Sequence, residues 1–571
     1  MTDLVVRGAL LPQPDRGLSA PHDLHLAGGR VSAVVPSGRP APPGVRVLDA
    51  GGRVAVPGFV DAHVHGAAAV LDPDVQLAML RQGVTSIVVG QDGVGFAPSD
   101  ERTCAWAAQY FAGIDGVHPT FRGGSVAELL ATYDGTTAVN VATLVPHGTV
   151  RLLVMGAAQR PATADETGRM AAIVGQALDD GAVGLSTGLE YVPAAWADEA
   201  ELVALARVVA ERGLPHVSHM RGYEAAAPTA FAELVRIARA TGVATHVSHL
   251  HGPSDALGAM VEDAGLAGLD VTFDSYPYLR GCSILAMVAL PTWLPLADPD
   301  ATLAALTGPA TADRLHAHLA TLDDLWPRTT LAWVPGTDPV TGEALRWAEG
   351  LTVPQVAEGL GVRPADAALR LLVASRLRAS CVFAQPPTNS AESVRVLADH
   401  PAQVAGSDAI YAPFGLAAEA GGEVGGGGFP HPRGWGAFAR LLAGRVLGRA
   451  TDLHDGAGAD LLGLPGPQEE AVPRWSWADA VEHMSARAAR RFRLAGHGSL
   501  APGAAGDVVL VDPQAVQDQA TYADPRRPAS GIDDVVVAGV PVLARGRLTG
   551  ATPGRPLRPA PVGVPRAPGR Q

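Results

Sequence analysis

Apolar runs of strand length alternate with amphipathic helical stretches along most of this chain, beginning near residue 54. The strand-like runs lie at 54–60, 85–90, 140–146, 182–189, 215–218, 244–248, 270–274 and 403–406. Helical patterns fill several of the intervals, at 75–82, 167–179, 198–212, 227–241 and 253–266. This alternation predicts a parallel sheet with crossover helices. Eight strands favour an α/β fold of the (β/α)8 TIM-like barrel type over an open doubly wound sheet. No Gly-x-Gly-x-x-Gly follows the first strand, which argues against a dinucleotide-binding fold.

The two ends of the chain have a different pattern, with short strands and turns in place of helices. The N-terminal part includes a hairpin signal at Gly28-Gly29, and β character returns near residue 499. We therefore expect residues 1–53 and 499–550 to pair into one small β-sandwich domain.

The remaining segments follow from these limits. The barrel is expected to span 54–498, with a mostly helical insertion around 284–390. A glycine-rich stretch at 421–428 follows the eighth strand and is either an active-site lid or a solvated loop. The Pro/Arg/Gly-rich tail at 551–571 is expected to be disordered.

Composition narrows the class of protein. The chain has 571 residues, 47% of them hydrophobic, so more than one structural unit is expected. It lacks an apolar run of the roughly 18 residues that span a membrane, and no signal peptide is indicated at its start. The three cysteines are scattered and indicate no disulfide framework, which favours a cytoplasmic protein.

The charged residues exclude some partners and some chemistry. A net charge of −14 without a basic stripe argues against nucleic acid and leaves a small-molecule substrate. All 43 cationic side chains are arginine, so no mechanism here uses a lysine as a Schiff base, a general base or a carbamylated metal bridge. Nothing in the sequence indicates an oligomeric state.

Polar residues stand at the carboxyl ends of the predicted strands, where a barrel of this type carries its catalytic groups. His63 and His65 end the first strand, and their i, i+2 spacing turns both imidazoles to one face. Any one strand-end histidine alone is more often an ordinary core or loop residue. The other strand ends supply Asp92, His147, Glu190, His219, His249, His251, Tyr276, Tyr278 and Asp408.

Together, these residues indicate a metal centre more specifically than any one of them does alone. A His-x-His pair, single histidines on the fifth and sixth strands and an aspartate on the eighth describe a mono- or binuclear metal centre. Such a centre activates water for attack on a carbonyl. An unpaired aspartate beside that water is well placed to take its proton and pass it to a leaving amine.

Several longer stretches carry a family resemblance, at 57–65, 83–86, 145–151, 184–193, 218–221, 274–278, 406–408 and 431–436. With these motifs in this order, the chain resembles the amidohydrolase superfamily and, within it, the N-acyl-D-amino-acid deacylase (D-aminoacylase) family. The resemblance implies a zinc-dependent hydrolase of linear amides. Its substrates would be N-acyl-D-amino acids or related N-acyl amines, from which it releases a carboxylate and a free amino acid.

The same resemblance implies roles for individual residues. His219 and His249 would hold a tightly bound Zn²⁺, and His63 and His65 would form a second, weaker metal position. Asp408 would be the general acid/base. Arg433 would bind the α-carboxylate of the substrate, a role that suits its planar fork, and Tyr276 would assist at the carboxylate or carbonyl.

Two positions depart from the family pattern. Asp92, in Gly90-Gln91-Asp92-Gly93, stands where family members usually have a cysteine, and a carboxylate is a harder ligand than a thiolate. His251 stands where they typically have a lysine, which predicts a weaker or different preference for the substrate anion. Glu190 is either an alternative metal ligand or a turn residue, and the adjacent Tyr191 completes the candidate substrate-binding set.

Two further functions stay open at this point. One is another amidohydrolase reaction, such as cyclic amide hydrolysis, and the other is a non-catalytic binding module with an amidohydrolase fold. The Arg433 segment favours the deacylase function because it supplies a group that would bind the substrate α-carboxylate. The presence of His63, His65 and Asp408 argues against the non-catalytic reading.

Overall fold

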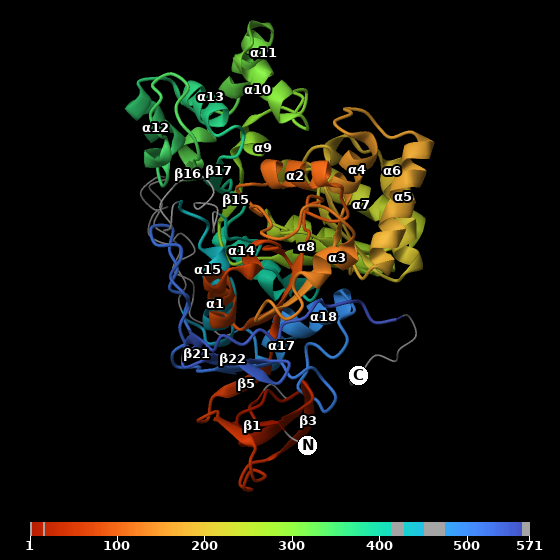
Figure 1. The fold of residues 1–571 in the computed structure, drawn as a ribbon, viewed down its shortest axis with the longest axis vertical. Helices are drawn as coiled ribbons and strands as arrows, with labels where there is room; N and C mark the ends of the chain where they lie inside the picture. Colours follow the sequence, from red (N-terminus) through yellow and green to blue (C-terminus); the bar gives the residue numbers. More distant parts are fainter. Residues whose placement is uncertain (1–2, 15–16, 413–427, 450–473, 562–571) are drawn as a thin grey trace.

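The computed structural model describes residues 3–14, 17–412, 428–449 and 474–561 of the chain. The glycine-rich stretch at 421–427 therefore lies outside the described residues. Figure 1 shows three regions along the long axis: a helical lobe at one end, a central α/β unit, and small β-sheets at the other end.

The central unit is built from parallel strands. One sheet has the order β6 (Phe59–Asp61), β8 (Val84–Val89), β9 (Asn140–Thr143). The second has the order β10 (Val145–Pro146), β11 (Leu185–Gly188), β12 (Pro215–His219), β13 (Ala244–Val247), β14 (Val271–Ser275), β18 (Gln403–Ala405). The two short strands β7 (Val64–His65) and β19 (Ala409–Ile410) also pair in parallel. Strands such as β8 are buried along their whole length, as expected for parallel strands that are covered on both faces.

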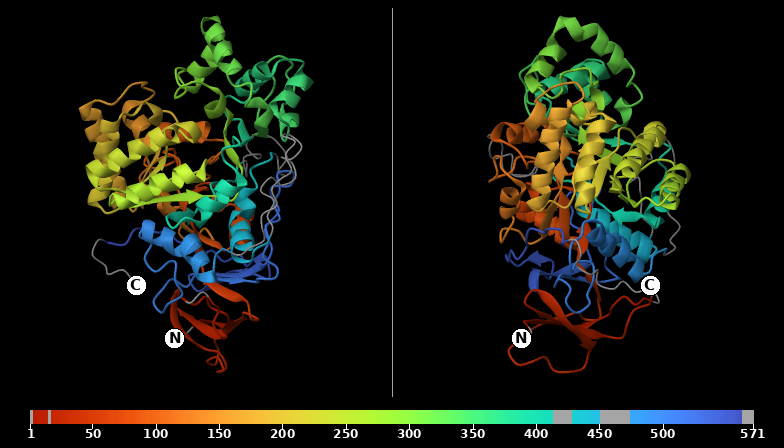
Figure 2. Two further views of the ribbon diagram at one scale, coloured as in Figure 1. Left: turned by 180° about the vertical axis from the view of Figure 1, so that it is seen from behind. Right: turned by 90° about the vertical axis from the view of Figure 1, so that its right-hand side faces the viewer.

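Helices follow these strands and cover their outside (Figures 1 and 2). Their apolar faces are buried, while capping residues fix where they start: Thr163 and Glu166 form a capping box at one of them, and Asp198 caps the next. The predicted alternation of strand and helix is confirmed. The helices of this unit are α1 (Pro73–Arg81), α2 (Glu101–Tyr110), α3 (Val126–Ala131), α4 (His147–Met155), α5 (Ala164–Asp179), α6 (Glu199–Glu211), α7 (Ala227–Thr241), α8 (Ser254–Leu266), α14 (Ala391–Asp399), α15 (Arg433–Leu441), α17 (Trp477–Val481) and α18 (Arg487–Arg491).

Both ends of the chain contribute small sheets, which lie together at the lower end of Figure 1. One buried apolar cluster joins them, with Leu24 from the N-terminal part and Val508 from the C-terminal part among its members. The first sheet has the order β3 (Arg30–Pro36), β2 (His22–Ala27), β1 (Leu4–Ala9), β4 (Arg46–Asp49). The second has the order β23 (Arg547–Leu548), β22 (Val540–Ala544), β21 (Ile532–Val537), β20 (Val508–Val511), β5 (Val54–Pro57).

The predicted single strand at 54–60 is two strands in the structure. β5 pairs antiparallel with β20 in the small sheet, and β6 pairs with β8 in the central unit. The chain passes between them at Gly58, where a Cβ would lie 1.9 Å from Thr85 Oγ1. Only glycine allows this close approach. Because β5 and β6 belong to different sheets, the boundary between the two units falls inside the apolar run.

The insertion contains an antiparallel sheet that the sequence did not predict. Its strands have the order β15 (Arg280–Ile284), β17 (Ser380–Ala384), β16 (Thr329–Trp333). Its helices are α9 (Leu285–Ala289), α10 (Pro299–Thr307), α11 (Pro309–Ala320), α12 (Val353–Leu360) and α13 (Pro364–Ala374). The region has an apolar core of its own, which includes the buried Trp326. These three strands are short, and their hydrophobic periodicity does not distinguish them from buried helix segments.

The expectation of a disordered tail from residue 551 is wrong for residues 551–561. Leu557 N donates to Val141 O at 2.8 Å, and Val141 N donates to Arg555 O at 3.1 Å. The tail thus follows the free edge of β9, and its extended Pro-rich chain is held by backbone hydrogen bonds to a distant strand. Residues 562–571 lie outside the described residues.

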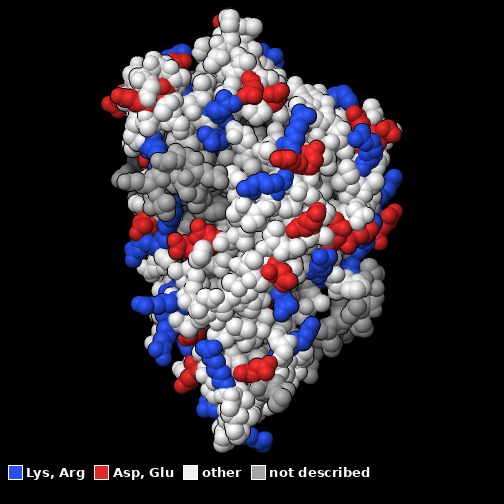
Figure 3. Space-filling view, in the orientation of Figure 1, with Lys and Arg blue, Asp and Glu red and all other residues white. Residues whose placement is uncertain are grey.

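Two surface properties bear on possible partners. Figure 3 shows acidic and basic side chains interspersed on the face in view, without a basic stripe. Within the described ranges, no helix combines the length and the apolar character that crossing a membrane requires.

Candidate functional site

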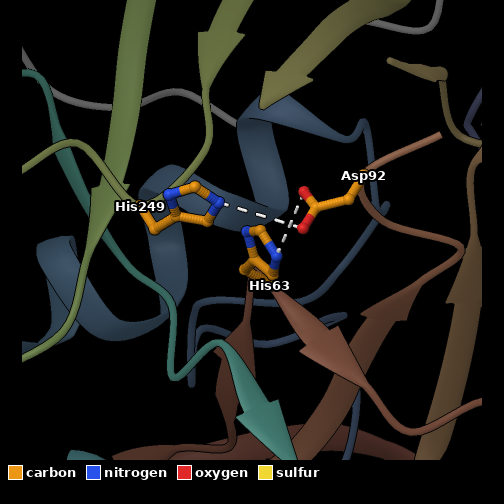
Figure 4. A group of neighbouring side chains, drawn as sticks. All are labelled: His63, Asp92 and His249. Carbon is orange, nitrogen blue, oxygen red and sulfur yellow. Dashed lines mark ion pairs between the residues drawn. The ribbon is translucent and has the colours of Figure 1, made fainter. Parts of the chain in front are cut away.

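Four histidines converge on the carboxylate of Asp92. They come from distant parts of the chain, at the carboxyl ends of parallel strands, and all are buried. Figure 4 shows the imidazoles of His63 and His249 turned toward Asp92. Asp92 Oδ1 lies 3.7 Å from His63 Nε2. Asp92 Oδ2 lies 3.5 Å from His65 Nε2, 3.7 Å from His219 Nδ1 and 3.9 Å from His249 Nε2.

A second carboxylate closes the other side of the histidine pair. Asp408 Oδ1 lies 3.6 Å from His63 Nε2 and 3.4 Å from His65 Nε2. Asp408 is held there by its own backbone, whose N–H donates to His63 O at 2.8 Å. The φ angles of Asp92, His249 and Asp408 are 54°, 35° and 50°, in the left-handed region that costs free energy for a non-glycine residue. Backbone strain of this kind concentrates at functional sites.

The donor atoms form two groups whose spacing suits a metal ion. His63, Asp92 and His249 offer atoms within 4.8 Å of one another, and so do His63, His65 and Asp408. His63 Nε2 and Asp92 Oδ1 are buried without a hydrogen-bond partner, so each has a lone pair with no other use in the structure.

The charges in the site also call for a cation. Burial alone would lower the pKa of His65, but hydrogen bonds to Asp408 and Asp92 raise that pKa to about 10. In the same way Asp92 and Glu190 outweigh burial and raise the pKa of His219 to about 9. The carboxylates thus stabilise positive charge among them, and a set of nitrogen and oxygen donors fits zinc or another divalent transition metal.

Asp274 orients two of the histidines and was not assigned a role from the sequence. Its Oδ2 lies 3.3 Å from His63 Nδ1 and 3.0 Å from His246 Nε2, and its Oδ1 accepts the His249 N–H at 2.8 Å. A carboxylate at Nδ1 of His63 fixes the tautomer with a free Nε2 lone pair. The only sequence signal was a carboxylate at the end of the seventh apolar run.

Asp61 plays a similar part between the first and eighth strands. It accepts Ser407 N–H at 2.8 Å and His63 N–H at 3.2 Å. The Ser407 hydroxyl donates to it as well, at 2.5 Å. These contacts tie the turn that carries Asp408 to the strand that carries His63.

Glu190 lies on the far side of His219 and not among the donor groups. Its Oε2 lies 2.8 Å from His219 Nε2, whereas His219 Nδ1 faces Asp92 and lies 2.9 Å from His249 Nε2. The structure therefore gives Glu190 an orienting position rather than the place of an alternative bridging ligand. The third-strand residue His147 is likewise outside the site, 2.7 Å from the buried Glu201.

A buried arginine faces the same carboxylate as the histidine pair. Arg433 is fully buried at the start of α15, and its Nη2 lies 2.8 Å from Asp408 Oδ2. The angles of this ion pair do not make a hydrogen bond, and none of the three guanidinium nitrogens has a hydrogen-bond partner among the described residues. The ring of Tyr276 lies below the guanidinium, 4.6 Å from ring centroid to Cζ. A planar donor fork without acceptors is suited to bind a carboxylate.

Tyr191 and His251 lie at the edge of this arrangement. The Tyr191 ring is 4.9 Å from the His219 ring, and its hydroxyl is 3.3 Å from Ser283 Oγ. His251 Nδ1 lies 2.7 Å from the His249 carbonyl, and its ring stacks on Tyr223. Burial lowers the pKa of His251 to about 4, so this residue is neutral at pH 7 and does not replace the charge of a lysine.

Comparison with known proteins gives matches over nearly the whole chain. Residues 46–543 match the model of the Amidohydrolase family. The chain is 32% identical to the N-acyl-D-glutamate deacylase of Alcaligenes xylosoxydans xylosoxydans, over 97% of this chain and 96% of that protein. It is 30% identical to the D-aminoacylase of the same organism, over 94% and 98%.

A solved structure gives the same result at the level of the fold. The N-acyl-D-glutamate deacylase from Bordetella bronchiseptica, complexed with zinc and a phosphonate inhibitor that mimics the tetrahedral intermediate, superposes with a TM-score of 0.72. The sequence identity is 29%, and the match covers 98% of this chain and 99% of that one.

Proposed function

The chain belongs to the amidohydrolase family, and we propose that it hydrolyses the amide bond of N-acyl-D-amino acids or closely related N-acyl amines. The observation that carries the proposal is the position of Asp408, which lies between the histidine pair and the buried guanidinium of Arg433. In this arrangement the histidines that would bind the metal and the Arg433 guanidinium that would bind the substrate carboxylate would contact one substrate from two sides. The relatives that match over nearly their full length are named N-acyl-D-glutamate deacylase, N-acyl-D-aspartate deacylase and D-aminoacylase.

We further propose that the metal is zinc, held chiefly by His219, His249 and Asp92. A second, weaker divalent ion would bind at His63 and His65. When bound, such an ion polarises the scissile carbonyl and lowers the pKa of water. Both carboxylate oxygens of Asp92 face histidine nitrogens and could act as metal ligands. Oδ1 faces His63, and Oδ2 faces His65, His219 and His249.

Asp408 is proposed to move the proton. Burial alone would raise its pKa, but Arg433 and His63 lower it below the usual range, so the carboxylate is ionised at neutral pH. It accepts a proton from water while the water oxygen bonds to the carbonyl carbon. It then donates that proton to the nitrogen as the C–N bond breaks, which leaves a free amine and a carboxylic acid that loses the second water proton to solvent and becomes the carboxylate.

Arg433 and Tyr276 are proposed to hold the other end of the substrate. The guanidinium binds the α-carboxylate through its unused donors, while the Tyr276 ring restricts the guanidinium plane from below. Because Asp408 is shared between the clamp and the metal group, binding of the carboxylate fixes the distance from the scissile amide to the proton carrier.

We also propose a two-part organisation for the whole chain. The parallel strands of the central unit would close into an eight-stranded barrel, which is supported by the hydrogen bond from Ala62 N to Ala405 O at 3.2 Å between the first and last strands. The two sheets built from the chain ends would form a β-sandwich around their shared apolar cluster.

The test is a screen of amine release from paired D- and L-N-acyl amino acids, with the protein loaded with zinc. We expect release from D-substrates that carry a free α-carboxylate, and bound metal by elemental analysis. A protein that binds no metal and releases no amine from any N-acyl-D-amino acid would contradict the proposal.

A further inference from the structure

A segment from the C-terminal part of the chain reaches the helix that carries Arg433. Residues 517–526 lie between β20 and β21, and in Figure 1 the blue chain beside β21 rises along α15. We propose that this segment positions the Arg433 guanidinium for carboxylate binding, with Asp518 and Tyr522 as the positioning residues. The inference rests on the proposed role of Arg433 and extends it to a part of the chain far from the metal group.

The first connection runs through His431. Arg433 N donates to His431 Nδ1 at 3.0 Å, so Nδ1 is the unprotonated nitrogen and Nε2 carries the hydrogen. His431 Nε2 lies 3.0 Å from Arg280 O and 3.1 Å from the Tyr522 hydroxyl. The ring is fully buried, and burial together with Arg433 holds its pKa well below the usual range. A neutral imidazole thus contacts the Arg433 backbone through Nδ1, and both β15 and the 517–526 segment through Nε2.

Aromatic rings pack around this imidazole and restrict its rotation. The Tyr278 ring meets it edge-on at 5.1 Å, and the Tyr522 ring meets it edge-on at the same distance. The Arg280 guanidinium lies 4.3 Å above the Tyr522 ring, which holds that ring in turn. A displacement of Tyr522 would therefore also displace His431 and, through it, the backbone of Arg433.

The second connection is the carboxylate of Asp518 on the flank of α15. It accepts the Tyr278 hydroxyl at 3.0 Å and Arg440 Nε at 2.8 Å. It also lies directly against the helix backbone at Gly436, where a Cβ would come within 1.9 Å of Asp518 Oδ1. A side chain at residue 436 would displace the Asp518 carboxylate, so glycine at this position allows Asp518 to pack directly against α15.

Arg433 needs such support because its own side chain has few partners. The guanidinium has one ion pair and one aromatic face, and no hydrogen bond among the described residues. Beyond these two contacts, its direction depends on the backbone from which it projects. A shift of α15 by a fraction of an ångström moves the whole fork relative to Asp408.

The experiment compares two variants of the metal-loaded protein. Tyr522→Phe removes only the hydroxyl that contacts His431, and Gly436→Ala forces Asp518 away from the helix. For each we would measure kcat and KM with an N-acetyl-D-amino acid and with its carboxamide counterpart, and the Kd of the product D-amino acid by calorimetry. Tyr133→Phe and Gly168→Ala are matched controls, because Tyr133 loses a buried hydroxyl contact to Ala67 O and Gly168 has open space around it.

We expect Tyr522→Phe to raise KM and the product Kd for carboxylate ligands about tenfold, with kcat within about twofold of wild type and the carboxamide unaffected. Gly436→Ala should move the same parameters further. Equal effects on carboxylate and carboxamide, or no effect of Tyr522→Phe, would overturn the inference. If Gly436→Ala does not fold, the Tyr522→Phe result decides.

The two proposals fail in distinguishable ways. A wild-type protein that binds D-amino acids but hydrolyses no N-acyl derivative refutes the proposed reaction, while the Kd comparison still tests the positioning. A wild-type protein that binds no carboxylate in either assay overturns the positioning inference as well.

Discussion

Replacement of Asp274 by asparagine should weaken metal binding although Asp274 itself is not a proposed ligand. The residue is fully buried and serves the N–H of His249 with one oxygen and the rings of His63 and His246 with the other. Asparagine has the same size but only one oxygen. If that oxygen keeps the His249 N–H, the amide NH₂ faces His63 Nδ1 and favours the tautomer in which Nε2 carries the proton.

That tautomer removes the lone pair that His63 turns toward Asp92. If the amide is flipped instead, its NH₂ opposes the His249 N–H, so one donor meets another donor in that orientation. Loss of a hydrogen bond to a charged partner costs about 1.5–3 kcal/mol, and loss of an outer partner of a metal-binding histidine weakens metal binding about 10–100-fold. We therefore expect the Kd for zinc to rise about 10–100-fold.

The assay is competition for zinc between the protein and a chromophoric chelator. The matched control is Asp507→Asn, because Asp507 is another buried carboxylate away from the histidines and accepts hydrogen bonds from Asn140 Nδ2 of β9 and from Ala538 N between β21 and β22. The control should lose stability without any change in zinc affinity. An unchanged zinc Kd in Asp274→Asn would show that His63 does not depend on this carboxylate, and the orienting role would have to be withdrawn.

Three other substitutions have specific outcomes. Asp408→Asn should keep bound metal but lower kcat about 10²–10⁴-fold, because it removes the proton carrier; loss of metal together with activity would make Asp408 mainly a ligand. Arg433→Ala should raise KM about 10–100-fold for substrates with an α-carboxylate and far less for neutral amides, so equal effects on both would refute the clamp. Burial lowers the pKa of His118 to about 4, and the neutral ring accepts the Phe121 N–H at 3.0 Å. The unfolded state binds the proton below a pKa of about 6.5, so unfolding free energy should fall by about 2 kcal/mol between pH 7.5 and pH 5 on account of this residue. His118→Asn should remove that part of the pH dependence in thermal unfolding, and an unchanged slope would exclude His118 as its source.

Much of the candidate site could be predicted because parallel strands end at the same edge of a sheet. His63, His65, His219 and His249 are far apart in sequence, yet each directly follows an apolar run. The ends of these runs meet in space for topological reasons alone. Asp408 followed from the same reasoning, and the structure brings it to His63 and His65.

The fold departed from prediction where a local pattern depends on distant partners. The run at 54–60 is apolar throughout because both of its halves are buried, but the halves belong to different sheets. The strands of the insertion and the segment around Leu557 are extended because other strands supply their hydrogen bonds. Single-sequence periodicity reports burial and not the identity of the partner.

The supporting residues of the site could not be predicted for a related reason. Asp274 and Asp518 are ordinary carboxylates in the sequence, and their roles come from contacts with residues hundreds of positions away, 211 for His63 and 240 for Tyr278. Glu190 shows the converse, since its place at a strand end suggested a ligand. The structure turns it to the outer nitrogen of His219.

Asp92 is the residue at which sequence and geometry constrain each other most. The sequence offered a carboxylate in place of a thiolate and left its role in doubt. In the structure its two oxygens face different partners, His63 on one side and His65, His219 and His249 on the other. A single thiolate sulfur has no such division. Oxygen is a harder ligand than sulfur, so a carboxylate at this position would raise the relative affinity for metals harder than zinc. The metal preference of this protein should therefore follow from Asp92 more than from the histidines.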